Sequence, residues 1–274
     1  MNKKVVFLDM DGTLILRDGS MPESAQEALR RARANGHEMV ICTGRSTTQI
    51  EPILKENADL FDGCVAAAGA QVNRGGKIIW HDCMSPEMAQ DLVSYFHEND
   101  VTFFLQADSG VYAEPSSMDN IVDAFKALGR TEEEIEDIFG LTILEEHPER
   151  IPGIEKCCYF QCPLEADVVQ RELGPAYYVV DSSYKVSRFC DGEINKAGVT
   201  KALGMEKYLE HVGVPHEDSI AFGDGPNDLE MIQYAHTGVV MGNGTDNLKA
   251  LADRVCGRID EDGIYNGFQE LGLI

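Results

Sequence analysis

Two aspartates that follow the first apolar segment are the residues whose types and spacing best suit chemistry. Asp9 and Asp11 come directly after the apolar residues 5–8, and Gly12 follows them. Carboxylates two residues apart on extended backbone share a side and repel each other, unless one is protonated or a cation lies between them. Mg²⁺ is the natural cation, because it takes a few oxygen ligands and leaves its other positions for water and phosphate oxygens. Two solvated aspartates in a turn are the structural alternative.

The segment at 5–8 predicts a strand buried on both faces, because its residues are β-branched or bulky and a turn signal ends it. Similar segments alternate with helical patterns along the chain, which predicts a parallel sheet built from βαβ units. Further strands are expected at residues 39–42, 63–67, 77–81, 219–222, 239–241 and 254–255, with 77–81 pairing back across a turn. Helices are expected at about 22–36, 46–57, 198–212, 226–234 and 245–252.

Polar side chains follow three of these strands. Parallel strands end at one edge of their sheet, where the loops form a crevice, so we expect these side chains to converge. The convergent residues with side-chain oxygens are Asp9, Asp11, Thr43, Asp224 and Asp228. A lysine joins them from a helix that begins near Lys196 or Lys201. Such a set is typical of a magnesium site with a nucleophile, directed at a phosphoryl group.

The pattern changes between residues 84 and 190, where helical stretches alternate with β-rich pieces. Hairpin-like pairs predict an antiparallel sheet, for example at 103–114 and at 177–189, where a strand is expected at 184–189. We interpret residues 84–190 as an α+β cap domain, inserted into a Rossmann-like core that is formed by 1–83 and 191–274. The acidic residues of the cap are most simply a solvated surface.

Composition limits the class of protein. The formal net charge of −24 argues against nucleic acid or an anionic membrane as partner, and an anionic substrate would need local cations. Eight cysteines without a CxxC pair indicate buried free thiols in a reducing compartment. We expect a cytoplasmic enzyme, because no signal peptide precedes the first strand and no apolar run is long enough to span a membrane. The oligomeric state is not predicted.

Four segments, in order, resemble the motifs of the haloacid dehalogenase superfamily, and within it the Cof-type phosphatases with an inserted type IIB α/β cap. They are Asp9-Met10-Asp11-Gly12-Thr13, Thr43-Gly44-Arg45, Gly198-Val199-Thr200-Lys201 and Gly223-Asp224-Gly225-Pro226-Asn227-Asp228. The resemblance implies that Asp9 is a nucleophile forming an aspartyl-phosphate. It implies that Asp11 protonates the leaving oxygen and then deprotonates water. Mg²⁺ would be held by the Asp9 carboxylate, the Asp11 backbone carbonyl and Asp224.

Other residues of these motifs can bind the phosphoryl group. The Thr43 hydroxyl can donate a hydrogen bond to a phosphoryl oxygen, and the backbone N–H groups of Met10 and Gly44 can donate further hydrogen bonds to the phosphoryl group. We prefer Lys201 over Lys196 as the lysine that neutralises phosphoryl charge, because its spacing to Asp224 resembles that of the family. Lys196 is then a loop residue.

Three residues keep more than one interpretation. Asn227 can bind phosphate or orient the lysine, and Asp228 can bind metal-ligated water or fasten the threonine and the lysine, but both can also simply cap a helix. Arg45 can reach substrate or pair with a surface acid. Two departures from the family pattern, Ala68 and Gly244, replace an Asn and an Ala that are common there, and the first puts transferred substrate preferences in doubt.

The predicted function is a Mg²⁺-dependent phosphatase for small phosphorylated metabolites, such as sugar, cofactor or nucleotide phosphates. The alternatives are a sugar phosphomutase or dedicated sugar-phosphate phosphatase on the same core, and a non-catalytic sensor. A mutase needs clustered basic residues in its cap to hold a second phosphate. The basic residues of the predicted cap are spread out; they include Arg130, Arg150, Lys156, Arg171, Lys185 and Arg188.

Overall fold

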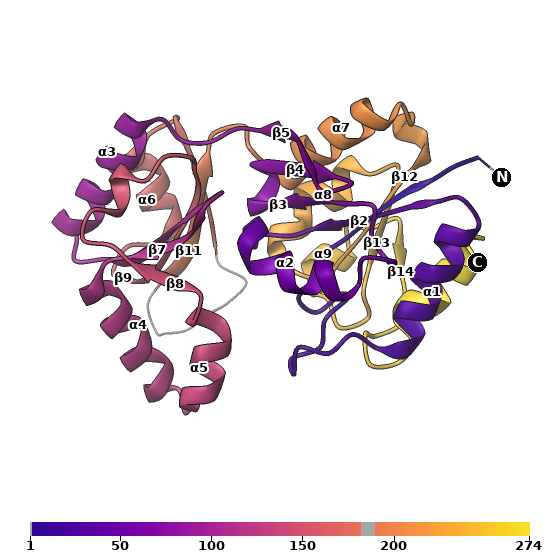
Figure 1. The fold of residues 1–274 in the computed structure, drawn as a ribbon, viewed down its shortest axis with the longest axis horizontal. Coiled ribbons are helices and arrows are strands. Elements are labelled where there is room, and N and C mark those ends of the chain that lie inside the picture. Colours follow the sequence, from indigo (N-terminus) through magenta and orange to yellow (C-terminus); the bar gives the residue numbers. More distant parts are fainter. Residues whose placement is uncertain (1, 182–189) are drawn as a thin grey trace. The chain divides into compact units, whose positions relative to one another are not determined.

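The computed structural model describes residues 2–181 and 190–274, and the predicted strand at 184–189 lies outside them (Figure 1). The chain forms two compact units. Unit 1 contains the residues up to Arg45 together with Glu51–His81 and Thr200–Ile274, and unit 2 contains Ser46–Ile50 and the described part of Asp82–Val199. The fold class is the predicted one, an α/β core with an inserted α+β domain.

Unit 1 is built on one eight-stranded sheet in the order β14-β13-β12-β1-β2-β3-β4-β5. The six strands from β14 to β3 run parallel, and β4 and β5 pair antiparallel. Their bounds are β1 Val5–Leu8, β2 Glu38–Cys42, β3 Gly63–Ala66, β4 Gln71–Arg74, β5 Lys77–His81, β12 Ser219–Gly223, β13 Thr237–Val240 and β14 Arg254–Val255.

Helices cover both faces of this sheet. Successive residues of a strand point to opposite faces, so Val5 and Phe7 pack with α7 and α8, while Phe222 packs its ring against Phe268 of α10. Helix α1 packs against β2 and against α10. The bounds are α1 Glu23–Ala34, α7 Lys201–Val212, α8 Leu229–Tyr234, α9 Asp246–Lys249 and α10 Gly263–Glu270. Helix α2, Thr47–Glu56, is divided between the two units. Helix α10 was not among the predicted elements.

The strand register sets which residues leave the sheet together. Leu8 pairs with Phe222 on one side and with Ile41 on the other. The next residue, Asp9, donates its backbone N–H to the Phe222 carbonyl at 2.9 Å. The segments that follow β1, β2 and β12 therefore begin at one edge of the sheet, although they are far apart in the sequence.

Unit 2 has its own six-stranded sheet, in the order β10-β11-β9-β6-β7-β8, antiparallel except for the β7–β8 pair. The predicted hairpin at 103–114 is the β6–β7 pair. The bounds are α3 Pro86–Glu98, β6 Thr102–Ala107, β7 Gly110–Ala113, α4 Pro115–Ala127, α5 Glu132–Phe139, β8 Thr142–Leu144, β9 Ile154–Cys162, α6 Ala166–Leu173, β10 Tyr177–Asp181 and β11 Cys190–Lys196.

Strand β11 corrects one prediction. The sequence assigned residues 191–199 to the core and Lys196 to a loop, but β11 lies between β9 and β10 in the sheet of unit 2. Glycine is needed at position 192 of β11, because a Cβ there would lie 2.3 Å from the Tyr159 ring. Lys196 donates to Asp82 at 2.5 Å within the same unit.

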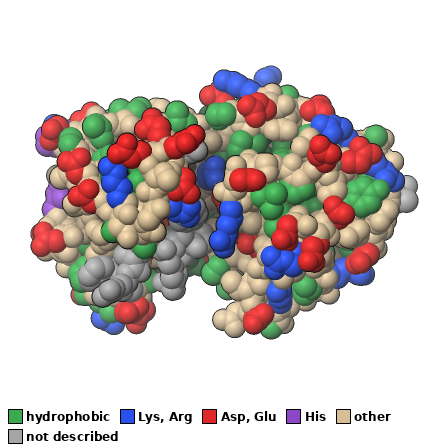
Figure 2. Space-filling model, turned by 90° about the horizontal axis from the view of Figure 1, so that it is seen from below, with side chains coloured by type: hydrophobic (Ala, Val, Ile, Leu, Met, Phe, Trp, Pro, Cys, Tyr) green, Lys and Arg blue, Asp and Glu red, His purple; other side chains and the backbone are tan. Residues whose placement is uncertain are grey.

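The described helices are all too short or too polar to cross a lipid bilayer. On the face shown in Figure 2, acidic and basic side chains are interspersed with small groups of apolar ones. That face carries no broad basic patch of the kind that would attract a polyanion.

A buried carboxylate ties the start of β2 to three other parts of unit 1. Glu38 is only 5% exposed. It accepts hydrogen bonds from Lys3 at 2.6 Å, Arg74 at 2.8 Å and the Tyr208 hydroxyl at 2.7 Å. Burial alone would raise the pKa of Glu38, but the hydrogen bonds from Arg74, Lys3 and Tyr208 outweigh it and lower the pKa to about 2.

We predict that Glu38→Gln lowers the free energy of unfolding of unit 1 by about 2 kcal/mol at neutral pH. Because the pKa is lower in the folded state, this stabilisation is complete above the ordinary value of 4.5 and is lost as the pH falls toward 2. The difference in free energy of unfolding between Glu38→Gln and the natural protein should therefore become smaller as the pH falls from 4.5 toward 2.

Urea unfolding followed by Trp80 fluorescence measures this directly, because the single tryptophan lies in β5 of unit 1. Glu51→Gln is the control, since Glu51 forms an exposed pair with Lys55 and should change little. An equal loss of stability in both variants would contradict the role given to Glu38.

Candidate active site

A buried lysine joins the ends of two strands. Helix α7 begins at Lys201, and the Thr200 side chain caps it by accepting from the Leu203 N–H at 3.2 Å. Lys201 is 2% exposed, and its Nζ donates to Asp9 Oδ1 and to Asp228 Oδ1, each at 2.6 Å. The start of α7, the end of β1 and the loop after β12 thus meet at one ammonium group.

Asp228 fastens the loop that follows β12. Its Oδ2 accepts from the backbone N–H groups of Asp224 at 2.8 Å and Gly225 at 2.9 Å. Its Oδ1 is already bonded to Lys201, so both oxygens have donors, and the residue is fully buried. This arrangement combines two of the predicted alternatives, fixing the lysine and capping a helical turn, and leaves Asp228 little capacity to bind a metal ion directly.

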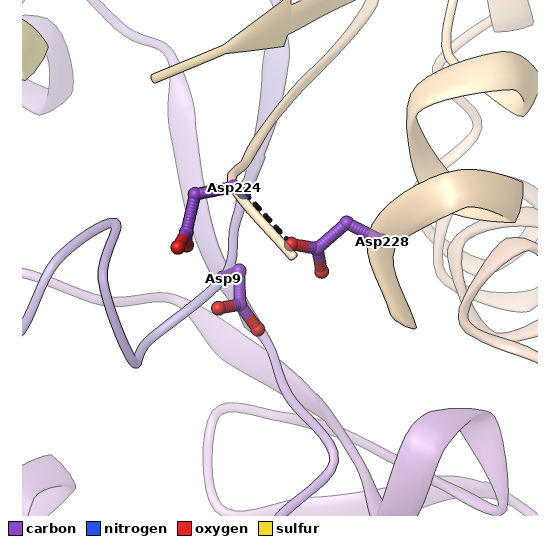
Figure 3. A group of neighbouring side chains, drawn as sticks. All are labelled: Asp9, Asp224 and Asp228. Carbon is purple, nitrogen blue, oxygen red and sulfur yellow. Dashed lines mark hydrogen bonds between the residues drawn. The ribbon is translucent and has the colours of Figure 1, made fainter. Parts of the chain in front are cut away.

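The Asp224 carboxylate lies on the side of Asp9, whereas the Asp228 carboxylate approaches the Asp224 backbone (Figure 3). Asp224 Oδ1 accepts a hydrogen bond from the Thr13 hydroxyl at 2.8 Å. Gly12 has a φ of +90°, and a Cβ at this position would lie 2.3 Å from Asp224 Oδ2. Only glycine can adopt that conformation next to the carboxylate, so the turn after β1 is fitted closely to Asp224.

The carboxylates of this cluster are in excess over the single ammonium. Burial raises the pKa of Asp9 well above its ordinary value, Asp228 adds to the rise, and Lys201 opposes it. Burial and Asp228 likewise raise the pKa of Asp224 to about 6. Burial would lower the pKa of Lys201, but Asp228 and Asp9 outweigh it and keep the lysine charged. Three acids and one lysine therefore favour a further cation at this position.

The donor set fits a hard divalent cation. Carboxylate oxygens of Asp9, Asp224 and Asp228 all lie within 4.8 Å of one another. Among the described residues, none donates a hydrogen bond to Asp9 Oδ2 or to Asp224 Oδ2. Mg²⁺ is bound in proteins by one or two carboxylates with water and phosphate oxygens completing its shell. The two free oxygens fit that requirement.

Asp11 lies outside the cluster and is paired with Arg45. The Arg45 guanidinium donates from Nε at 2.9 Å and from Nη2 at 2.5 Å to the two oxygens of Asp11. The backbone does not continue as an extended strand from Asp9 to Asp11, because the chain turns after Met10. The Met10 carbonyl accepts from three successive N–H groups, those of Thr13, Leu14 and Ile15.

The threonine loop follows β2 at the same edge. Thr43 is buried, and its Oγ1 accepts from the Arg45 N–H at 3.2 Å. The segment after β3 supports this loop, since the N–H groups of Ala67 and Ala68 donate to the carbonyls of Arg45 and Thr43. Ala68 has a φ of 54°, a left-handed conformation that the Asn common in the family would tolerate better.

The other predicted binding residues are placed as follows. Met10 is fully buried, whereas Gly44 and Asn227 are half-buried. Sequence reasoning missed one contributor, Asn243, whose side chain donates to the Gly12 carbonyl at 2.8 Å and accepts from the Ile259 N–H at 2.9 Å. Its position directly after β13, at the same edge of the sheet, was the available signal.

The fold and the lysine-bridged acids define an α/β enzyme with its site at the carboxyl edge of a parallel sheet. The sequence profile of the haloacid dehalogenase-like hydrolases matches residues 6–268, so the chain belongs to this family and is a phosphatase-type hydrolase. It is 28% identical over 277 residues to the 5-amino-6-(5-phospho-D-ribitylamino)uracil phosphatase YitU of Bacillus subtilis, covering 97% of this chain and 96% of the relative. It is 27% identical over 270 residues to the pyridoxal phosphate phosphatase YbhA of Escherichia coli, covering 96% and 97%.

Solved structures share the whole architecture. A hypothetical protein of Geobacillus kaustophilus superposes with a TM-score of 0.83 and 27% identity over the full length of both chains. The subclass IIB sugar phosphatase BT4131 superposes with a TM-score of 0.79 and 24% identity, covering 99% of this chain and all of that one. The similarity to BT4131 shows that this chain has the fold of subclass IIB, including a cap of the predicted type.

We predict that Gly12→Ala lowers the rate of 4-nitrophenyl phosphate hydrolysis by about 100-fold, because its Cβ must displace the Asp224 carboxylate. Gly19→Ala is the matched control. Gly19 also has a positive φ, +82°, but a Cβ there meets no atom within 4 Å. Both substitutions strain the backbone by about 1 kcal/mol, so similar rates in the two variants would contradict the fit between Gly12 and Asp224.

Proposed function

We propose that this protein is a Mg²⁺-dependent phosphatase of small phosphorylated metabolites that forms an aspartyl-phosphate on Asp9. The observation that carries the proposal is the position of the Asp9 carboxylate. One oxygen is fixed by the buried Lys201 ammonium, and Asp9 lies with Asp224 and Asp228 in an acidic cluster fit for a divalent ion. Mg²⁺ bound there would neutralise phosphoryl charge and keep Asp9 ionised.

In the proposed first step, a carboxylate oxygen of Asp9 attacks phosphorus and the bond to the leaving oxygen breaks. Asp11 gives its proton to that oxygen. In the second step, Asp11 takes a proton from water, the water oxygen attacks phosphorus, and the bond to Asp9 breaks. Phosphate leaves, and both aspartates return to their starting states.

The surrounding residues support these steps. Lys201 neutralises phosphoryl charge, and Thr43 donates its hydroxyl to a phosphoryl oxygen, aided by the N–H groups of Met10 and Gly44. Asp9 and Asp224 would hold the metal with the Asp11 carbonyl, as the resemblance to the family implies. Asp228 acts by fixing Lys201 and the Asp224 loop, because both of its oxygens are already bonded.

We propose that the inserted domain selects the leaving group. One named relative is a 5-amino-6-(5-phospho-D-ribitylamino)uracil phosphatase, another is a pyridoxal phosphate phosphatase, and a structural neighbour is a sugar phosphatase. These classes form the first panel of test substrates. A mutase is not supported by the described basic residues of unit 2. Lys156 pairs with Glu193 and Arg130 with Glu134, while Lys185 and Arg188 lie outside the described residues.

The proposed compartment is reducing, such as the cytoplasm. Seven described cysteines carry free thiols, and most of them are buried. Disulfides are rare in such compartments, whereas secreted proteins commonly contain them.

We predict that the natural protein releases phosphate from 4-nitrophenyl phosphate only when Mg²⁺ is present, and that Asp9→Asn abolishes turnover because the amide cannot attack phosphorus. Phosphate release with and without EDTA measures both effects. Asp18→Asn is a control in the same loop, since among the described residues Asp18 bonds only the exposed Ser20. Retained turnover in Asp9→Asn would exclude the covalent mechanism.

A further inference from the structure

The turn that follows β1 is held by a side chain from a distant part of the sequence. Asn243, on the loop after β13, donates from its amide to the Gly12 carbonyl at 2.8 Å, although the two residues are 231 positions apart. The Gly12 N–H donates to the Ile15 carbonyl at 3.0 Å. The peptide groups on both sides of Gly12 are therefore hydrogen-bonded.

These bonds restrain a turn that is flexible by its composition. Glycine has more backbone freedom than any other residue, so a turn that relies on Gly12 needs restraint from its surroundings. The next residue, Thr13, is fully buried and donates its hydroxyl to Asp224 Oδ1 at 2.8 Å. A rotation of the peptide between Gly12 and Thr13 would move that hydroxyl away from the carboxylate.

Asn243 is itself fixed in place. Its Oδ1 accepts from the Ile259 N–H at 2.9 Å, which orients the amide. The preceding residue, Gly242, donates its N–H to the Gly257 carbonyl at 2.9 Å, and its own carbonyl accepts from Lys249 Nζ at 2.7 Å. The amide of Asn243 is thus a fixed point for the turn after β1.

The same loop holds the backbone of Asp224. The Thr245 N–H donates to the Asp224 carbonyl at 3.1 Å. A Cβ at Gly244 would lie 3.1 Å from that carbonyl and 2.7 Å from Val240, so glycine, where the family commonly has Ala, lets the loop approach closely. The loop after β13 therefore contacts the main chain of Asp224 directly, and its side chain through Gly12 and Thr13.

We propose that Asn243 is a positioning residue for the cation site, because it keeps the Thr13 hydroxyl on Asp224 and thereby keeps that carboxylate beside Asp9. The role rests on the proposed function, in which Asp9 and Asp224 would hold Mg²⁺. Oxygens of these two aspartates lie within 4.8 Å of each other, so the contacts that start at Asn243 end at the proposed nucleophile. Carboxylates this close repel each other, and the neutral donor on Asp224 opposes that repulsion.

This role differs from a merely structural one in its effect on metal affinity. Groups that orient the ligands of a metal commonly change its affinity by about 10- to 100-fold. An asparagine that only joined two segments of unit 1 would contribute to stability and leave the cation site as it is. Asn35 provides that comparison, because its amide also donates at 2.8 Å to a carbonyl distant in the sequence, that of Leu273.

The test measures the Mg²⁺ dissociation constant by isothermal titration calorimetry, without substrate and at constant ionic strength. For Asn243→Ala we expect the dissociation constant to rise about 10-fold. For Asn35→Ala, the matched control, it should not change. Urea unfolding followed by Trp80 fluorescence shows that both variants are folded and compares their stabilities.

A second arm repeats Asn243→Ala in a Thr13→Val background, in which Asp224 has already lost its hydroxyl donor. If Asn243 acts through that hydroxyl, its substitution has little further effect on the dissociation constant there. An unchanged constant in Asn243→Ala, an equal rise in Asn35→Ala, or an undiminished rise in the Thr13→Val background would overturn the proposal. Failure of the phosphatase function itself is distinguishable, because the natural protein would then bind Mg²⁺ without releasing phosphate from 4-nitrophenyl phosphate.

Discussion

The site depends on one ammonium group that is shared between two buried carboxylates. Lys201 contacts Asp9, which is 192 residues away in the sequence, and Asp228 on the following loop. Removing one partner of such a buried pair costs about 3–5 kcal/mol, because the remaining charge is left without compensation. The nucleophile, the lysine and the Asp224 loop are thus coupled, because a shift of any one of them would break hydrogen bonds that hold the others.

The fold places this lysine by close backbone packing. Helix α7 approaches β3 at Gly204, where a Cβ would lie 2.4 Å from Val65. The start of α7 approaches the segment after β3 at Gly69, where a Cβ would lie 2.0 Å from the Thr200 carbonyl. Larger residues at either position would shift the helix, and Lys201 with it. The parallel register then brings β1 and β12 to the same level, so that Asp9 and Asp224 follow adjacent strands.

Sequence alone predicted the features that depend on local pattern. The apolar run at 5–8 and the acids after it were sufficient to predict a buried strand and an acidic edge, because a parallel sheet brings strand ends together. That Asp11 pairs with Arg45 and not with the buried acids could not be predicted, since it depends on the turn after Met10, which pairwise spacing cannot show. Strand β11 was missed because residues 190–196 contain no apolar run and are mostly polar. Its Gly192 admits the Tyr159 ring, a contact that depends on the tertiary fold. The identity of the metal ligands and the role of the cap stay predictions.

The choice between two lysines tests the account most directly. Phosphate release from 4-nitrophenyl phosphate should be measured for Lys201→Met and Lys196→Met, after both variants are shown to keep the Trp80 fluorescence of the folded protein. We expect a loss on the order of 1000-fold for Lys201→Met, because the phosphoryl charge and Asp9 lose their partner. We expect nearly full activity for Lys196→Met, which loses only a partly exposed pair with Asp82. Equal rates in the two variants would contradict a site organised around Lys201.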